Sequence, residues 1–160
     1  MRLVVWLVLA GLVVLGSAGC SSSRPGGGSS GSAASPGDQA VARARGSVEA
    51  KAVAETEFGL LAGGDYGGAW ALWTDDAKAA VPRDEFVSQS VGCRPGLAVA
   101  TRVVTADPVD ATHVRITWDR GGRTGVAEML QINGAWRYQP DQATLDGYQA
   151  GTVCAGISPR

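Results

Sequence analysis

Histidine and cysteine are scarce in this 160-residue sequence, which holds one histidine, His113, and three cysteines, Cys20, Cys93 and Cys154. Zinc sites are built mainly from histidine and cysteine side chains at short, regular spacings. No two of these four residues stand at such a spacing. The sequence therefore predicts no metal site, and no motif in it indicates a cofactor.

Clustered positive charge is also missing. The 14 lysine and arginine residues nearly balance the 15 aspartate and glutamate residues, which gives a formal net charge of −1 at pH 7. The basic residues are scattered singly along the chain. Because binding to a phosphate backbone needs a basic stripe or patch, nucleic acid is not an expected partner.

A long apolar run occurs at the start of the chain. One positive charge, Arg2, precedes residues 3–19, which carry no charge. This order is typical of a secretory signal peptide. Small residues at 17–19 lead directly into Cys20, which resembles a bacterial lipobox. The resemblance implies that residues 1–19 are removed, that Cys20 carries a lipid, and that the protein is anchored at the extracytoplasmic face of the cell membrane.

Two other interpretations of the apolar run stay open. A transmembrane anchor that is retained uncut accounts for the run, but its 17 residues barely reach the length that spans a bilayer, and it gives Cys20 no role. A secreted protein with a free thiol at Cys20 keeps a reactive group unpaired in an oxidising compartment. Only the lipoprotein interpretation assigns a role to both the run and Cys20.

The rest of the chain divides into a tether and one domain. Residues 20–38 comprise the lipidated cysteine and a tract of little but Ser, Gly, Ala and Pro. Such a tract cannot bury enough apolar surface to order itself, so we expect a disordered tether with a reach of about 20 to 25 Å. Residues 39–160 have the size of a single domain.

Cys93 and Cys154 remain within that domain. Two cysteines in an exported domain most simply pair with each other. The bond would close a loop of about 60 residues and stabilise the fold by about 4 kcal/mol in the chain-entropy model. The sequence therefore predicts a Cys93–Cys154 disulfide.

Helical signals come first in the domain. They predict helices over residues 39–62, 65–73 and 81–92. We expect Asp65 to cap the second helix and Pro82 to be the first residue of the third. The expected apolar face of the first helix consists of Val41, Val48, Ala52, Glu55, Phe58 and Leu61.

Strand signals follow, and they predict an antiparallel meander. The expected strands are residues 97–105, 113–119, 124–132 and 135–139, with a short helix within residues 144–157. Asn133-Gly134 is a hairpin signal that sets Ile132 opposite Ala135 and Leu130 opposite Arg137. Helices followed by a meander predict an α+β fold, with N-terminal helices packed on a sheet of about four strands.

Two segments carry a family resemblance. FGLLAGGDYGGAWALWTDDAKAAVPRDEFV (residues 58–87) and INGAWRYQ (residues 132–139) resemble the nuclear transport factor 2-like superfamily, particularly small domains of bacterial lipoproteins. The shared motifs are G-D-Y-x-x-A-W, a helix with D-x-x-K, an E-F helix and a G-x-W strand. The resemblance implies a curved sheet wrapped around helices as a cone with an apolar pocket, often dimeric through the sheet. The scarcity of lysine beside abundant Ala, Gly, Val and Arg resembles proteins of GC-rich, actinobacterial-type genomes.

Both faces of the predicted meander carry large apolar side chains. One face must pack on the helices, and the other includes Val126, Leu130 and Ile132 or their opposites. That second face is either covered by the C-terminal segment or used as a partner surface, for example in a homodimer. A bulge in the third strand is a further solution.

The sequence offers two weak catalytic candidates, Glu128 and His113. If the face with Glu128 lines a pocket, the carboxylate could act as a general base; the favoured alternative is an ion pair with Arg137 or Arg115. His113 starts a strand with no nucleophile motif nearby, so a surface role is favoured for it.

Two functions follow from these residues. The first is a membrane-anchored, non-catalytic module that binds a small apolar ligand or an envelope protein. The second is a pocket enzyme of the isomerase or dehydratase kind, with Glu128 as its base.

Overall fold

The structure of the protein is a computed structural model that describes residues 34–155. The predicted leader, Cys20 and most of the predicted tether lie outside the described residues. All of the described residues belong to one unit of the chain, Ala33–Arg160. Within residues 34–155, no helix combines the length and the apolar character that crossing a membrane requires.

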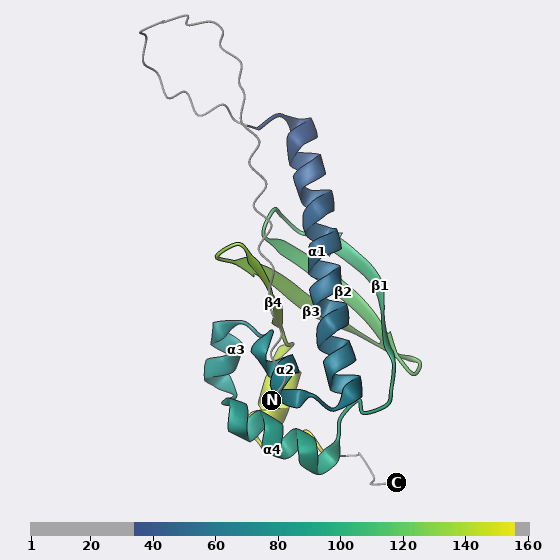
Figure 1. The fold of residues 1–160 in the computed structure, drawn as a ribbon, viewed down its shortest axis with the longest axis vertical. Helices are drawn as coiled ribbons and strands as arrows, with labels where there is room; N and C mark the ends of the chain where they lie inside the picture. Colours follow the sequence, from purple (N-terminus) through teal and green to yellow (C-terminus); the bar gives the residue numbers. More distant parts are fainter. Residues whose placement is uncertain (1–33, 156–160) are drawn as a thin grey trace, which may run out of the picture. The chain divides into compact units, whose positions relative to one another are not determined.

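Helix α1 (Pro36–Gly63) begins three residues before the expected start, inside the predicted tether. Ser35 caps it, because the Ser35 side chain accepts from the Asp38 N–H and the Asp38 carboxylate accepts from the Ser35 N–H. Gly64 ends the helix in the left-handed conformation, with φ of 81°. Residues 36–45 are exposed, and this first part of α1 projects past the sheet (Figure 1).

The face of α1 that packs on the sheet is rotated from the expected one. The buried residues of α1 are Ala50, Ala54, Glu57 and Phe58. Four residues of the expected apolar face are exposed instead: Val41, Val48, Ala52 and Glu55. Small residues are favoured on this face of α1 because the sheet supplies bulky side chains. For example, a Cβ atom on Gly46 would lie only 3.1 Å from the Trp136 ring. The prediction was wrong because it ranked side chains by apolarity and not by fit.

Three short helices follow: α2 (Tyr66–Ala71), α3 (Asp75–Ala80) and α4 (Arg83–Cys93). Asp65 caps α2 as predicted, with its carboxylate accepting from the Gly68 N–H at 2.8 Å. The helical signals in the sequence did not predict α3. The D-x-x-K motif of the family resemblance lies in this helix. Pro82 was expected to be the first residue of the third predicted helix. It is instead the N-cap of α4, which begins at Arg83.

Four strands form one antiparallel sheet in the order β1-β2-β3-β4: β1 (Thr101–Pro108), β2 (His113–Arg120), β3 (Arg123–Ile132) and β4 (Ala135–Gln139). The predicted hairpin register is confirmed, since Ile132 pairs with Ala135 and Leu130 with Arg137. A bulge lies in β1, between Val103 and Thr105, and not in the third strand.

The inner face of the sheet packs against α1 (Figure 1). The buried cluster between them, the inner core, consists of Ala50, Ala54, Phe58, Val103, Val114, Ile116, Met129 and Trp136. Phe58 meets Trp118 and Tyr138 edge to face, with ring centroids 6.2 and 5.8 Å apart. The buried side chains of the inner core occupy the space between α1 and the sheet.

Helix α5 (Gln142–Gln149) joins the short helices in a second cluster, the helical core. Its members are Tyr66, Trp73, Ala77, Val81, Phe86, Leu145 and Tyr148. Cys93, at the end of α4, forms a disulfide with Cys154, with the two Cα atoms 5.3 Å apart, so the predicted pairing is confirmed. Cover of the outer sheet face by the C-terminal segment was one of the open alternatives; up to residue 155, this segment packs in the helical core instead.

Candidate functional site

The outer face of the sheet brings the two sequence-predicted candidates into contact. His113 Nε2 lies 2.7 Å from Glu128 Oε2, and Arg115 Nε donates to Glu128 Oε1 at 2.9 Å. The His113 and Glu128 side chains are 27% and 29% exposed, and Arg115 is 54% exposed. We call these three residues the outer-face triad.

The pairing of β2 with β3 builds this triad. Arg115 is directly opposite Glu128, and His113 is opposite Leu130, the next outward-facing position of β3. Alternate residues of a strand share a face, so the three polar side chains meet on one side of the sheet. Of the two predicted partners of Glu128, Arg115 is therefore the correct one. Arg137 lies opposite Leu130 and forms no ion pair with a described residue.

Apolar side chains border the triad. Val104 and Val126 are 49% and 44% exposed, and Leu130 and Ile132 are half-buried on the same face. Opposite charges are matched across the strands, because Arg102 is paired with Asp119 and Arg115 with Asp107. The face is thus a mixture of exposed apolar surface and balanced charge.

Two neighbours hold the Glu128 carboxylate in place. Both carboxylate oxygens of Glu128 are engaged, one by a guanidinium and one by an imidazole. These two bonds fix the orientation of the carboxylate and place it in a polar network with Arg115 and His113. The triad also lies on an open sheet surface, where water is not excluded, and not in the space between α1 and the sheet.

A second glutamate, Glu57 of α1, is a functional candidate that the sequence reasoning missed. Its side chain is 1% exposed and lies between the inner core and the helical core. Trp73 Nε1 donates to Glu57 Oε1 at 3.3 Å, whereas Glu57 Oε2 has no hydrogen-bond partner among the described residues. Burial raises the pKa of Glu57 to about 7, against smaller lowering effects from Trp73 and the Arg120 charge.

The surroundings of Glu57 are aromatic. Burial, reinforced by the Glu57 charge, raises the pKa of Tyr138 well above its ordinary value. Trp73 packs edge to face on Phe86, with centroids 4.7 Å apart. Glu57 stands three residues after Ala54 and seven after Ala50, so it lies on the buried face of α1, a face that the sequence analysis did not select.

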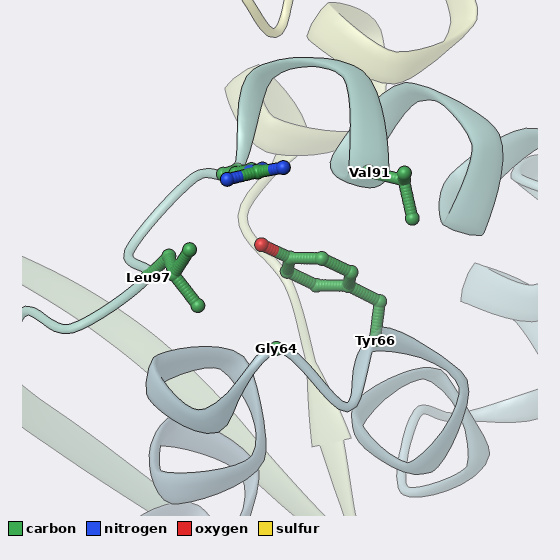
Figure 2. A pocket seen from close by; sticks show the side chains of 5 residues that line it. Gly64, Tyr66, Val91 and Leu97 are labelled. Atoms are coloured by element: carbon green, nitrogen blue, oxygen red, sulfur yellow. The ribbon is translucent and has the colours of Figure 1, made fainter. Parts of the chain in front are cut away.

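A hollow of about 160 Å³ lies where the ends of α1 and α4 meet the start of α2 (Figure 2). Its lining residues are Gly64, Tyr66, Val91, Arg94 and Leu97. This hollow is outside the inner core and away from the outer-face triad. The sequence did not indicate it, because its walls come from three separate elements.

Metal ligands do not gather in the part of the chain that the structure describes: no group of three or more histidine, cysteine, aspartate or glutamate side chains is placed to hold an ion there. Comparison with known proteins finds no matching family model, no matching curated protein and no matching solved structure. The class that the coordinates define is therefore an α+β domain with helices packed on a four-stranded antiparallel sheet.

Proposed function

We propose that this protein is a membrane-anchored, extracytoplasmic lipoprotein whose domain is a non-catalytic binding module of the nuclear transport factor 2-like type. The motif at residues 17–20 supports the anchor. The disulfide supports it as well, because Cys93 and Cys154 satisfy each other and leave Cys20 for the lipid. The order of helices and meander supports the family.

The observation that carries the binding function is the open outer face of the sheet. Helix α1 lies on the opposite face, and α2 to α5 pack in the helical core, so no described helix covers this one. Exposed apolar side chains beside matched charges are typical of surfaces that bind proteins. The occupant that we infer is a protein of the same mixed character, and a second copy of this chain meets that condition by symmetry.

The enzyme alternative has less support. It needs Glu128 in a substrate pocket, whereas Glu128 lies on the outer face with both oxygens bonded to cationic or imidazole partners. The inner face, where a pocket would lie, is filled by Phe58, Met129 and Trp136.

Site-specific photo-cross-linking tests the binding surface. A photoreactive phenylalanine analogue replaces Val126 in the full chain, expressed in its own cell envelope. Because Val126 is 44% exposed on the proposed surface, we expect a cross-linked protein product, at twice the mass of the chain if the occupant is a second copy. The matched control carries the analogue at Val48, which is 69% exposed on α1. Equal products at both positions, or none at Val126, would contradict the proposal.

Mass spectrometry of the mature protein tests the anchor separately. We expect a chain that begins at Cys20 and carries a diacylglyceryl group. An uncut chain with an unmodified Cys20 would overturn the localisation without bearing on the binding surface.

A further inference from the structure

The hollow beside Tyr66 contains a buried donor with no partner. Tyr66 is 4% exposed, and its hydroxyl makes no hydrogen bond to any described residue. Figure 2 shows this hydroxyl pointing from α2 toward the side of the hollow that Leu97 lines. Burying a hydroxyl without a partner is costly, so the position favours a molecule that supplies an acceptor.

The state of the phenol makes it a donor. Burial raises the pKa of Tyr66 above its ordinary value, against a smaller lowering effect of the Arg94 charge. The phenol therefore keeps its proton at neutral pH. Arg94 lines the same hollow and brings a positive charge to it.

Arg94 is free to take an anion. It follows α4 in the left-handed conformation, with φ of 51°, and is exposed. Within residues 34–155, no acidic side chain forms an ion pair with it. The carboxylate of Asp65, the residue before Tyr66, accepts from the Gly68 N–H as the cap of α2. Arg94 and Tyr66 both line the hollow, and a guanidinium and a phenol hydroxyl are the two kinds of donor that a carboxylate accepts from.

The other residues that line the hollow limit the size of a ligand and favour an apolar part. Val91 and Leu97 are apolar, and a Cβ on Gly64 would lie 3.2 Å from Leu97 Cδ1, so the glycine keeps that side open. The volume of about 160 Å³ lies below the roughly 300 to 1,000 Å³ of pockets for drug-sized ligands. The ligand must therefore be small, with a short branched or linear aliphatic part.

We propose that this hollow is a binding site for a small aliphatic carboxylate, held by the Tyr66 hydroxyl and the Arg94 guanidinium. The carboxylate is either a free short-chain acid or the C-terminal group of a peptide that ends in a small apolar residue. The site is independent of the outer sheet face, so the two proposals stand or fall separately.

Equilibrium dialysis of the detergent-solubilised full chain with radiolabelled isobutyrate tests the site. We expect saturable binding, weakened about tenfold or more in Tyr66→Phe and in Arg94→Gln, because each loses a hydrogen bond to a charged group. Tyr66→Phe keeps the ring and removes a buried hydroxyl that no described residue binds, so its melting temperature should be equal to or higher than that of the unmodified chain. Arg43→Gln, which removes an exposed arginine near the start of α1, is the matched control and should bind normally.

Competition identifies the source of the carboxylate. Isobutyramide, the neutral analogue, should compete at least about tenfold less well than isobutyrate, because the charge-assisted hydrogen bonds are lost. Tighter competition by acetyl-Ala-Val than by isobutyrate would assign the site to peptide C-termini, and the reverse would assign it to free acids. Absence of saturable binding, equal binding by Tyr66→Phe, or equal competition by isobutyramide would overturn the proposal.

Discussion

Two glutamates lie on opposite sides of the sheet, Glu128 on its outer face and Glu57 on helix α1 next to its inner face, and they share no hydrogen-bond partner. Glu128 on the outer face is 29% exposed and is bonded through both oxygens to Arg115 and His113. Glu57, above the inner face, is 1% exposed and has a single hydrogen bond, from Trp73. An ionised side chain therefore costs little free energy on the outer face and much more inside. This difference is expected when one face of a sheet packs on a core and the other faces solvent or a partner.

The largest expected effect comes from comparing substitutions at two neighbouring residues of β2. Ile116 is fully buried on the inner face, whereas Thr117 is half-buried on the outer face. We expect Ile116→Ala to lower the free energy of unfolding by about 2 to 5 kcal/mol, because it removes methyl groups and leaves a cavity. Thr117→Ala should change it by less than about 0.5 kcal/mol. Urea unfolding of both variants provides the measurement, and similar losses would show that the outer face is packed as a core.

The second test concerns the pH dependence that Glu57 introduces. Its pKa is raised from 4.5 to about 7 in the folded state, so the folded protein binds a proton that the unfolded chain has released between these pH values. Stability from this group is complete below pH 4.5 and is lost as pH rises to about 7. The total loss is about 3 kcal/mol, from the pKa difference.

Glu57→Gln should remove that slope and raise the free energy of unfolding at pH 8, since glutamine still accepts from Trp73 without carrying a charge. Unfolding curves collected from pH 4 to pH 8 measure the effect. Glu128→Gln is the control on the other face and should keep the slope. A Glu57→Gln variant with the same slope as the unmodified chain would show that Glu57 is ionised without cost in the folded protein.

The sheet was predictable from the sequence, and the reason is local. Alternation of apolar and polar residues fixes which side chains share a face, and Asn133-Gly134 fixes the register of the last hairpin. The same logic led to the Glu128–Arg115 pair, although it left Arg137 as an equal choice. Register across β2 and β3 decides between them, and it depends on contacts distant in the sequence.

The interior was less predictable, because fit there depends on several elements together. Val41 and Val48 are more apolar than Ala50 and Ala54, yet the alanines face the sheet, since Trp136 and Met129 already fill the space. Glu57 was not singled out from the sequence, and charged side chains seldom lie fully buried. The hollow at Tyr66 depends on how three helix ends meet, for which no single segment carries a signal.

The smallest effect is expected from the outer-face triad itself. Arg115→Ala and Glu128→Ala, with the double variant, form a cycle that isolates the coupling between the two side chains. Both are partly exposed, so we expect a coupling of about 0.2 to 1 kcal/mol that weakens further at high salt. Urea unfolding at low and high ionic strength measures it.

If the cross-linked assembly forms through this face, the coupling should increase in the assembled protein, because a partner that removes water from the ion pair also removes its screening. A coupling above about 2 kcal/mol in the isolated chain would instead show that the outer face already provides the low-dielectric surroundings that Glu57 has inside.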